Sequence, residues 1–219
     1  MELLSGLTLT GIDDRTDLAE LEYMITKYEW IEFGVLLSAK PKAGNRYPNP
    51  LRIERMSQVL GRNLSVHVCG ASARAILLGG GYDHLLKGIG RIQLNGHVSV
   101  EELTSAIARF PEQQIITQYS HAHDALLDLT ATFEHHALLV DASGGRGVLP
   151  KSWHAPATDK PVGFAGGLGH YNLEQELPKI IKVARPGWWI DMESSLRNPS
   201  DWFSVEQARE VADIVECAL

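Results

Sequence analysis

Two side chains that could do chemistry together stand close in the sequence, in an apolar segment at residues 64–69. His67 and Cys69 are two positions apart, so in an extended strand both point to the same face, and the neighbouring valines point to the other. A thiol beside an imidazole favours nucleophilic or acid/base chemistry, because the thiolate is the reactive form of cysteine. The alternative is a buried thiol beside a hydrogen-bonded core histidine.

An aspartate ends a second apolar segment, at residues 137–141. Asp141 follows four apolar residues and precedes a glycine-rich turn. A carboxylate in such a place is costly to bury unless it is paired or used. We expect Asp141 to act as a general acid or base on a bound substrate. The alternative is that it accepts hydrogen bonds from its own turn.

Two further segments end in groups that suit different ligands. Gly166 and Gly167 follow a short apolar run, and glycines let a backbone approach a ligand closely and direct its amides at an anion. Asp191 and Glu193 share one face of the last apolar segment, and Ser194 follows them. Two carboxylates suit a metal ion or a hydroxyl-rich ligand better than a phosphate. The sequence leaves both ligands open.

Amide and imidazole groups lie near other apolar segments. Gln93 and Gln118 stand near two segment ends, where each either orients a substrate or packs in the interior. Four histidines form a separate group: His121, His123, His135 and His136. Their spacing is not typical of a zinc site, and we expect them on loop and helix surfaces.

These groups can act together only if the fold brings the segment ends to one place. Apolar runs occur at residues 3–10, 30–37, 64–69, 90–94, 114–119, 137–141, 162–165 and 188–192. Helical periodicity lies between most of them, and three helix starts carry a reciprocal capping pattern: Ser99–Glu102, Asn172–Gln175 and Ser204–Gln207. Alternating strands and helices require parallel strands with right-handed crossovers. About eight strands favour an α/β fold, the closed (β/α)8 TIM barrel, whose chemistry sits at the carboxyl ends of the strands.

The length and composition indicate one barrel domain over residues 1–219. Because 219 residues fall short of the roughly 250 typical of this fold, we expect the Gly- and Pro-rich segment 142–160 to replace a regular helix after the sixth strand. The net charge of −7 argues against a nucleic-acid partner. No apolar run reaches the length of a membrane span, and Cys69 and Cys217 are too few for a disulfide framework. We expect a cytoplasmic protein that contacts no membrane.

The order of these segments resembles phosphoribosylanthranilate isomerase, the tryptophan-pathway barrel enzyme that performs an Amadori rearrangement. The resemblance covers most of the chain through short motifs. They are Leu9-Thr10-Gly11-Ile12, Phe33-Gly34-Val35-Leu36, Asn45-Arg46-Tyr47, Ile92-Gln93-Leu94-Asn95-Gly96, Leu138-Leu139-Val140-Asp141, Ala165-Gly166-Gly167-Leu168, Ala184-Arg185-Pro186 and Ile190-Asp191-Met192. The resemblance implies that Asp141 is the general acid, that Arg46 contacts the substrate, and that Gly166 and Gly167 hold a phosphate.

Two parts of the family's machinery differ in this chain. The family's general base is a cysteine that ends the first strand, and Thr10 stands in that place. A threonine hydroxyl is far less acidic than a thiol and does not replace it. The family's phosphate grip includes a Ser-Ser-Gly turn after the last strand, which here reads Glu193-Ser194-Ser195 and places a carboxylate near the expected dianion. We therefore predict a barrel with another use.

A relocated thiol is one way to restore the chemistry. Cys69, with its pKa lowered by His67, would face Asp141 across the mouth of the barrel and form a base–acid pair with it. The residues expected to contact the substrate are Arg46, Gln93, Gln118, Gly166, Gly167, Asp191, Glu193 and Ser194.

Four functions are consistent with these residues. The leading hypothesis is an isomerase (of the intramolecular oxidoreductase type) or lyase that acts on a small sugar-like or phosphosugar metabolite by proton transfer, without a cofactor and outside the tryptophan pathway. A metal-dependent aldolase or hydrolase would hold a divalent ion with His67, Asp141, Asp191 and Glu193. An authentic phosphoribosylanthranilate isomerase and a non-catalytic ligand-binding barrel are the other two. The expected partner is a small anionic or sugar-like molecule, bound by a monomer or homodimer.

Overall fold

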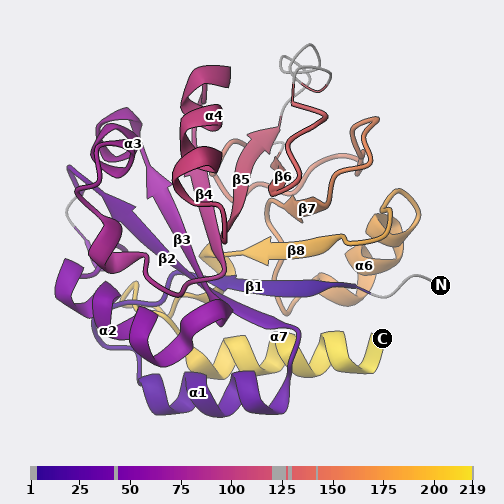
Figure 1. Cartoon of the computed structure of the whole chain (residues 1–219). Helices are drawn as coiled ribbons and strands as arrows, with labels where there is room; N and C mark the ends of the chain where they lie inside the picture. Colours follow the sequence, from indigo (N-terminus) through magenta and orange to yellow (C-terminus); the bar gives the residue numbers. More distant parts are fainter. Residues whose placement is uncertain (1–3, 42–43, 120–126, 128–129, 142, 219) are drawn as a thin grey trace.

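Eight parallel strands form a closed barrel in the computed structural model, which describes residues 4–41, 44–119, 127, 130–141 and 143–218 (Figure 1). Each strand pairs with the next, and β8 pairs with β1. The strands are β1 Gly6–Thr10, β2 Ile31–Ser38, β3 Leu64–Cys69, β4 Arg91–Asn95, β5 Gln114–Tyr119, β6 His136–Asp141, β7 Val162–Ala165 and β8 Trp189–Met192. The TIM-barrel prediction is confirmed. The strand ends agree with the expected ones to within one residue, except at the start of β1, where Leu3 lies outside the described residues.

Helices alternate with the strands and pack around the barrel (Figure 1). They are α1 Leu18–Lys27, α2 Pro50–Leu60, α3 Ala71–Leu78, α4 Val100–Arg109, α6 Leu173–Ile181 and α7 Val205–Ala218, with the short 3-10 helices η1 Gly61–Asn63, η2 Asp83–Leu85 and η4 Ser194–Leu196. Residues 143–160 contain neither helix nor strand, so the expected irregular connection after β6 is confirmed. None of the described helices combines the length and apolar character that a membrane crossing needs.

The three expected helix caps have different outcomes. Ser99 and Glu102 form the full capping box at the start of α4. At α7, the Ser204 hydroxyl accepts from the Gln207 amide at 3.3 Å, which is one half of the pattern. The prediction for Asn172 is wrong: its side chain makes no cap bond to α6 and instead accepts from the Gly169 amide at 2.9 Å. A competing acceptor role in the preceding turn explains the difference.

Alternation along the strands divides the apolar side chains into two cores. In β3, Leu64, Val66 and Val68 belong to the large core that includes the inner faces of the helices. A smaller apolar cluster fills one side of the barrel interior and consists of Ile116, Ala137, Leu139, Ala165 and Trp189. Many of the other interior positions are buried and polar: Thr8, Thr10, Glu32, Ser65, His67, Gln93 and Asp191. Packed interiors of this fold are usually apolar, so this polar half must serve a purpose other than packing.

The Trp189 indole packs inside the barrel, in space that is open because Gly163 has no side chain. The two residues are paired between β7 and β8, and a Cβ on Gly163 would overlap the indole ring. On the ring's face lies the Arg91 guanidinium, 4.0 Å from the ring centroid, a cation–π arrangement. Gly163 is therefore required by close packing and not by backbone conformation.

We expect Gly163→Ala to destabilise the barrel by about 1–3 kcal/mol, the usual cost of overpacking a core. Urea unfolding followed by circular dichroism measures the change. Gly6→Ala is the matched control, since it adds the same methyl group in β1 at ordinary contact distance, 3.6 Å from the Trp189 Cβ. Equal stabilities for the two variants would show that the indole moves aside without cost.

Candidate functional site

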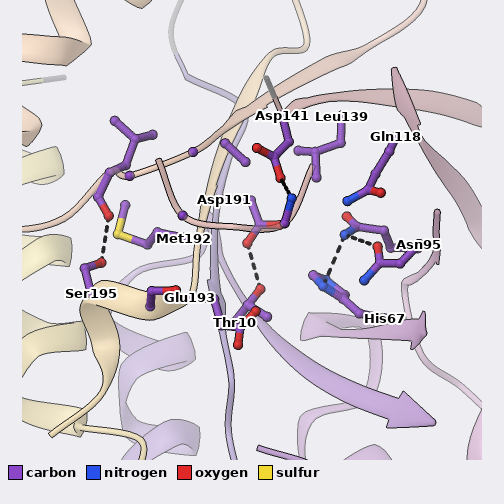
Figure 2. Close-up of a pocket in the computed structure, with 18 of the residues that line it drawn as sticks. Thr10, His67, Asn95, Gln118, Leu139, Asp141, Asp191, Met192, Glu193 and Ser195 are labelled. Carbon is purple, nitrogen blue, oxygen red and sulfur yellow. Dashed lines mark hydrogen bonds between the residues drawn. The ribbon is translucent and has the colours of Figure 1, made fainter. Parts of the chain in front are cut away.

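A cavity of about 90 Å³ opens at the carboxyl ends of the strands (Figure 2). Its volume suits a small metabolite. The lining comes from β1, from β3 to β8 and from the loops after β6, β7 and β8: Thr10, His67, Gln93, Asn95, Gln118, Leu139, Asp141, Gly145, Gly147, Ala165, Gly166, Gly167, Leu168, Tyr171, Asp191, Met192, Glu193, Ser194 and Ser195. The chain thus gathers most of the expected substrate-contacting residues in one place.

Asp191 is a buried carboxyl group of this cavity with a raised pKa. It is 6% exposed, and its Oδ1 accepts a hydrogen bond from the Thr10 hydroxyl at 2.7 Å (Figure 2). Burial raises the pKa of Asp191 to about 7; the Thr10 hydrogen bond opposes this rise and the Glu193 charge adds to it. A carboxyl group with this pKa is present in both protonation states near neutral pH, as a general acid/base must be.

The position of Thr10 depends on a glycine in the next strand. Thr10 pairs with Gly34 between β1 and β2, and a Cβ on Gly34 would overlap the Thr10 hydroxyl. The absence of that Cβ leaves the hydroxyl free to reach Asp191. Thr10 therefore orients a carboxyl group in this site.

Asp141 lies at the end of β6, and its carboxyl group is held by its own turn. Oδ1 accepts from the Ser143 amide at 3.0 Å and from the Ser143 hydroxyl at 2.7 Å, and Oδ2 accepts from the Gly145 amide. Asp141 thus accepts hydrogen bonds from its own turn, which is the alternative that the sequence analysis gave. It does not remove Asp141 from the site, since the carboxyl group also lines the cavity (Figure 2). Its catalytic role stays a prediction.

His67 and Cys69 share the inner face of β3 as expected, but the imidazole does not activate the thiol. Burial, followed by the charge of Arg91, lowers the pKa of His67 to about 3, so the ring is neutral at physiological pH. Burial also raises the pKa of Cys69. A neutral imidazole supplies no cation to stabilise a thiolate, and this part of the hypothesis is corrected. His67 lines the cavity, whereas Cys69 is not among the described residues of its lining.

Arg46 binds two carboxylates of its own chain. Its Nη1 donates to Glu193 at 2.8 Å, and its Nε and Nη2 donate to Asp201 at 3.2 and 3.0 Å. An anionic ligand would have to displace one of these carboxylates. Arg46 itself lies outside the described lining of the cavity, so its contact with substrate stays a prediction.

The Gly166–Gly167 turn also lines the cavity, with φ angles of 116° and 65° that favour glycine. Its close approach is to the chain itself: a Cβ on Gly167 would lie 2.5 Å from the Leu149 nitrogen. Asn172 donates to the Gly167 carbonyl at 2.9 Å, and Ser195 donates to the Leu168 carbonyl at 2.7 Å. The turn is rigidly held, which does not by itself identify its ligand.

The charges of the lining are all of one sign. Among the described lining residues, Asp141, Asp191 and Glu193 are acidic, and no Lys or Arg is present. The four residues expected to bind a metal all line the cavity, yet no group of three or more His, Cys, Asp or Glu among the described residues is arranged to hold an ion. The metal-dependent alternative stays a prediction, and a lining of this charge disfavours an anionic ligand.

Gln93 and Gln118 both line the cavity, and each is also bonded to protein. Gln118 Oε1 accepts from the Gly96 amide at 3.0 Å, and Gln93 contacts His67 and Asn95. Sequence reasoning did not select Asn95 as a site residue. Asn95 is two positions after Gln93, so the alternation that placed His67 and Cys69 on one face could have identified it.

The expectation that four histidines lie on loop and helix surfaces holds only in part. His121 and His123 lie outside the described residues, and His135 is exposed. His136 is 2% exposed at the start of β6, where its Nε2 lies 2.8 Å from the Thr117 hydroxyl. The strand begins one residue earlier than expected, and this extension buries His136.

Comparison with protein-family models and with curated proteins gives no match. Solved structures do match. Phosphoribosylanthranilate isomerase from Thermus thermophilus is 18% identical, with a TM-score of 0.65 over 98% of this chain and 100% of that one. TrpF from Jonesia denitrificans is 16% identical, with a TM-score of 0.66 over 96% of both chains. 3-Hexulose-6-phosphate synthase from Salmonella typhimurium is 15% identical, with a TM-score of 0.55 over the full length of both. The chain therefore has a phosphoribosylanthranilate isomerase-like TIM-barrel fold.

Proposed function

We propose that this protein is an isomerase or lyase that moves protons on a small, uncharged hydroxy-carbonyl compound such as a ketose. The observation that supports the proposal is Asp191, a buried carboxyl group whose pKa of about 7 lies in the working range of a general acid/base. Asp141 lies on another strand at the same cavity in a different environment. Two carboxyl groups with different surroundings are a recurrent basis for dividing acid and base roles.

In this mechanism the Asp191 carboxylate removes the proton from the carbon next to the carbonyl. The electron pair of the broken C–H bond forms a C=C bond, and the π pair of the carbonyl moves to its oxygen, which gives an enediolate. Protonated Asp191 then returns the proton to the neighbouring carbon, while Asp141 accepts the hydroxyl proton and passes it to the other oxygen. No redox partner is needed, because the oxidation of one carbon balances the reduction of the next. In a lyase, the same hydroxyl proton transfer accompanies cleavage of a C–C bond.

Proton exchange tests this function before the product is known. Dihydroxyacetone, D-erythrulose, D-ribulose and D-xylulose are incubated with the protein in D₂O, and the loss of the proton signals next to the carbonyl is followed by NMR. At least one ketose should exchange faster than in buffer alone, and the Asp191→Asn variant should not accelerate it. Exchange at the buffer rate for every ketose would contradict the proposal. Growth of a strain that lacks the tryptophan-pathway isomerase tests the original reaction, and we expect no rescue.

The carboxylates of the cavity should make it select against phosphate esters. Like charges about 4 Å apart cost roughly 1 kcal/mol in water and about 4 kcal/mol near a protein surface, so D-ribulose 5-phosphate should bind at least about tenfold more weakly than D-ribulose. Calorimetric titration measures both. Glu193→Gln is the matched variant, since it removes the negative charge that is paired with Arg46, and it should reduce the discrimination. Tighter binding of the phosphate ester to the unaltered protein would show that backbone amides dominate.

A further inference from the structure

A chain of hydrogen bonds fixes the position of the proton on His67. The Cys69 thiol donates to the His67 carbonyl at 3.4 Å, which leaves the sulfur to accept from Asn95 Nδ2 at 3.4 Å. Asn95 Oδ1 consequently faces Gln93 Nε2, from which it accepts at 2.9 Å. Gln93 Nε2 also lies 3.2 Å from His67 Nδ1, toward which its second hydrogen is available. Two N–H groups cannot bond each other, so Nδ1 carries a lone pair and the proton of the neutral ring is on Nε2.

The Nε2 group has no partner among the described residues, although it is buried. His67 is 2% exposed, its ring lines the cavity, and it points toward the middle of the barrel (Figure 2). A buried N–H without an acceptor costs free energy in the unliganded protein. A ligand oxygen placed against Nε2 would satisfy it.

We infer that His67 is the hydrogen-bond donor of this site, which contacts the carbonyl or enediolate oxygen of the ligand through Nε2–H. The inference rests on the proposed function for the nature of that oxygen, but the position of the proton does not depend on it. A neutral imidazole is suited to this task because it stabilises a developing oxyanion without giving up its proton. Gln93 is then a positioning residue, and Cys69 anchors the chain of hydrogen bonds in place of acting as a nucleophile.

Nitrogen NMR of the whole protein with ¹⁵N-labelled histidine tests the inference directly. The unaltered protein at pH 7 should show His67 with a protonated Nε2 and an unprotonated Nδ1, and this state should persist at pH 5. Addition of D-erythrulose should shift the Nε2–H signal. Gln93→Glu should move the proton to Nδ1, because a carboxylate only accepts, and should slow ketose proton exchange about ten- to hundredfold with KM changed less than about threefold.

Each result supports or overturns the inference. A protonated Nδ1 in the unaltered protein overturns it whether or not the protein is active, and no variant is needed for that measurement. An unmoved Nε2–H signal on addition of a ketose that undergoes Asp191-dependent exchange also overturns it, since His67 then contacts an internal water. A shifted Nε2–H signal without proton exchange on any ketose supports the donor role and removes the proposed function instead. Gln118→Glu, at another amide of the lining, is the control and should leave the His67 tautomer unchanged.

Discussion

Asp191→Asn should lower the rate of ketose proton exchange by about 10²- to 10⁴-fold, the usual contribution of a general acid/base. The same substitution should make the protein more stable at pH 8. Asn keeps the oxygen that accepts from the Thr10 hydroxyl, so the geometry is retained while the titrating group is lost. Exchange measured in D₂O and urea unfolding at several pH values give the two results.

The sign of the stability change follows from the direction of the pKa shift. Folding raises the pKa of Asp191 from its ordinary 3.8 to about 7, so between these values the folded protein binds a proton that the unfolded chain does not. The contribution of Asp191 to stability is therefore fully present below pH 4 and falls by about 1.4 kcal/mol per pH unit as the pH rises to 7. Above pH 7 the loss is complete. Asp191→Asn removes this penalty, so the gain should be a few kcal/mol at pH 8 and vanish at pH 4.

Thr10 provides the matched control for this prediction. Its hydrogen bond opposes the rise in the pKa of Asp191, so Thr10→Val should move the inflection of the pH–rate profile above 7, and Thr10→Ser should leave it in place. A profile that keeps its inflection in Thr10→Val, or an Asp191→Asn variant with unchanged exchange, would assign the chemistry to another group.

The barrel itself could be predicted because its signals are local. β3 is an apolar run with Ser65, His67 and Cys69 on one face, and its bounds could be predicted from this segment alone. The irregular segment after β6 is likewise marked by its own glycines and prolines. Such local patterns predict the strands correctly because every strand of a closed barrel has one face toward the interior and one toward the helices.

Pairings across the barrel could not be predicted, because they join residues far apart in sequence. Arg46 was expected to meet an anion, and its partner Asp201 lies 155 residues away. The sequence indicated only that Thr10 is too weakly acidic to act as a base. Its hydrogen bond to Asp191 could not be predicted, because the two residues are 181 positions apart. The activation of Cys69 by His67 failed for a related reason: burial from all sides, which no local pattern reveals, keeps the imidazole neutral.

Asp141→Asn should also reduce proton exchange by at least about 10²-fold, but with the opposite effect on stability. The Ser143 amide, the Ser143 hydroxyl and the Gly145 amide all donate to the two carboxylate oxygens of Asp141. Asn offers one oxygen and one NH₂ group, so at least one donor of the turn would face another donor. We expect a loss of about 1 kcal/mol, the low end of the usual cost of a polar group left without its partner, because Asp141 is only half-buried.

Ser143→Ala separates the two roles of Asp141. It removes the hydroxyl bond at 2.7 Å and leaves the carboxylate and the Ser143 amide in place, so it should cost about 1 kcal/mol and slow exchange less than about tenfold. If Asp141→Asn slows exchange no more than Ser143→Ala does, the carboxyl group serves only to shape the turn. A large loss of exchange in Asp141→Asn, together with nearly normal exchange in Ser143→Ala at similar stability, would require the carboxylate itself to act on the substrate. Both Asp→Asn variants would then lower the rate of exchange, but Asp191→Asn would raise the stability and Asp141→Asn would lower it. This difference is expected because burial disfavours the charged form of Asp191, whereas hydrogen bonds from its own turn stabilise the carboxylate of Asp141.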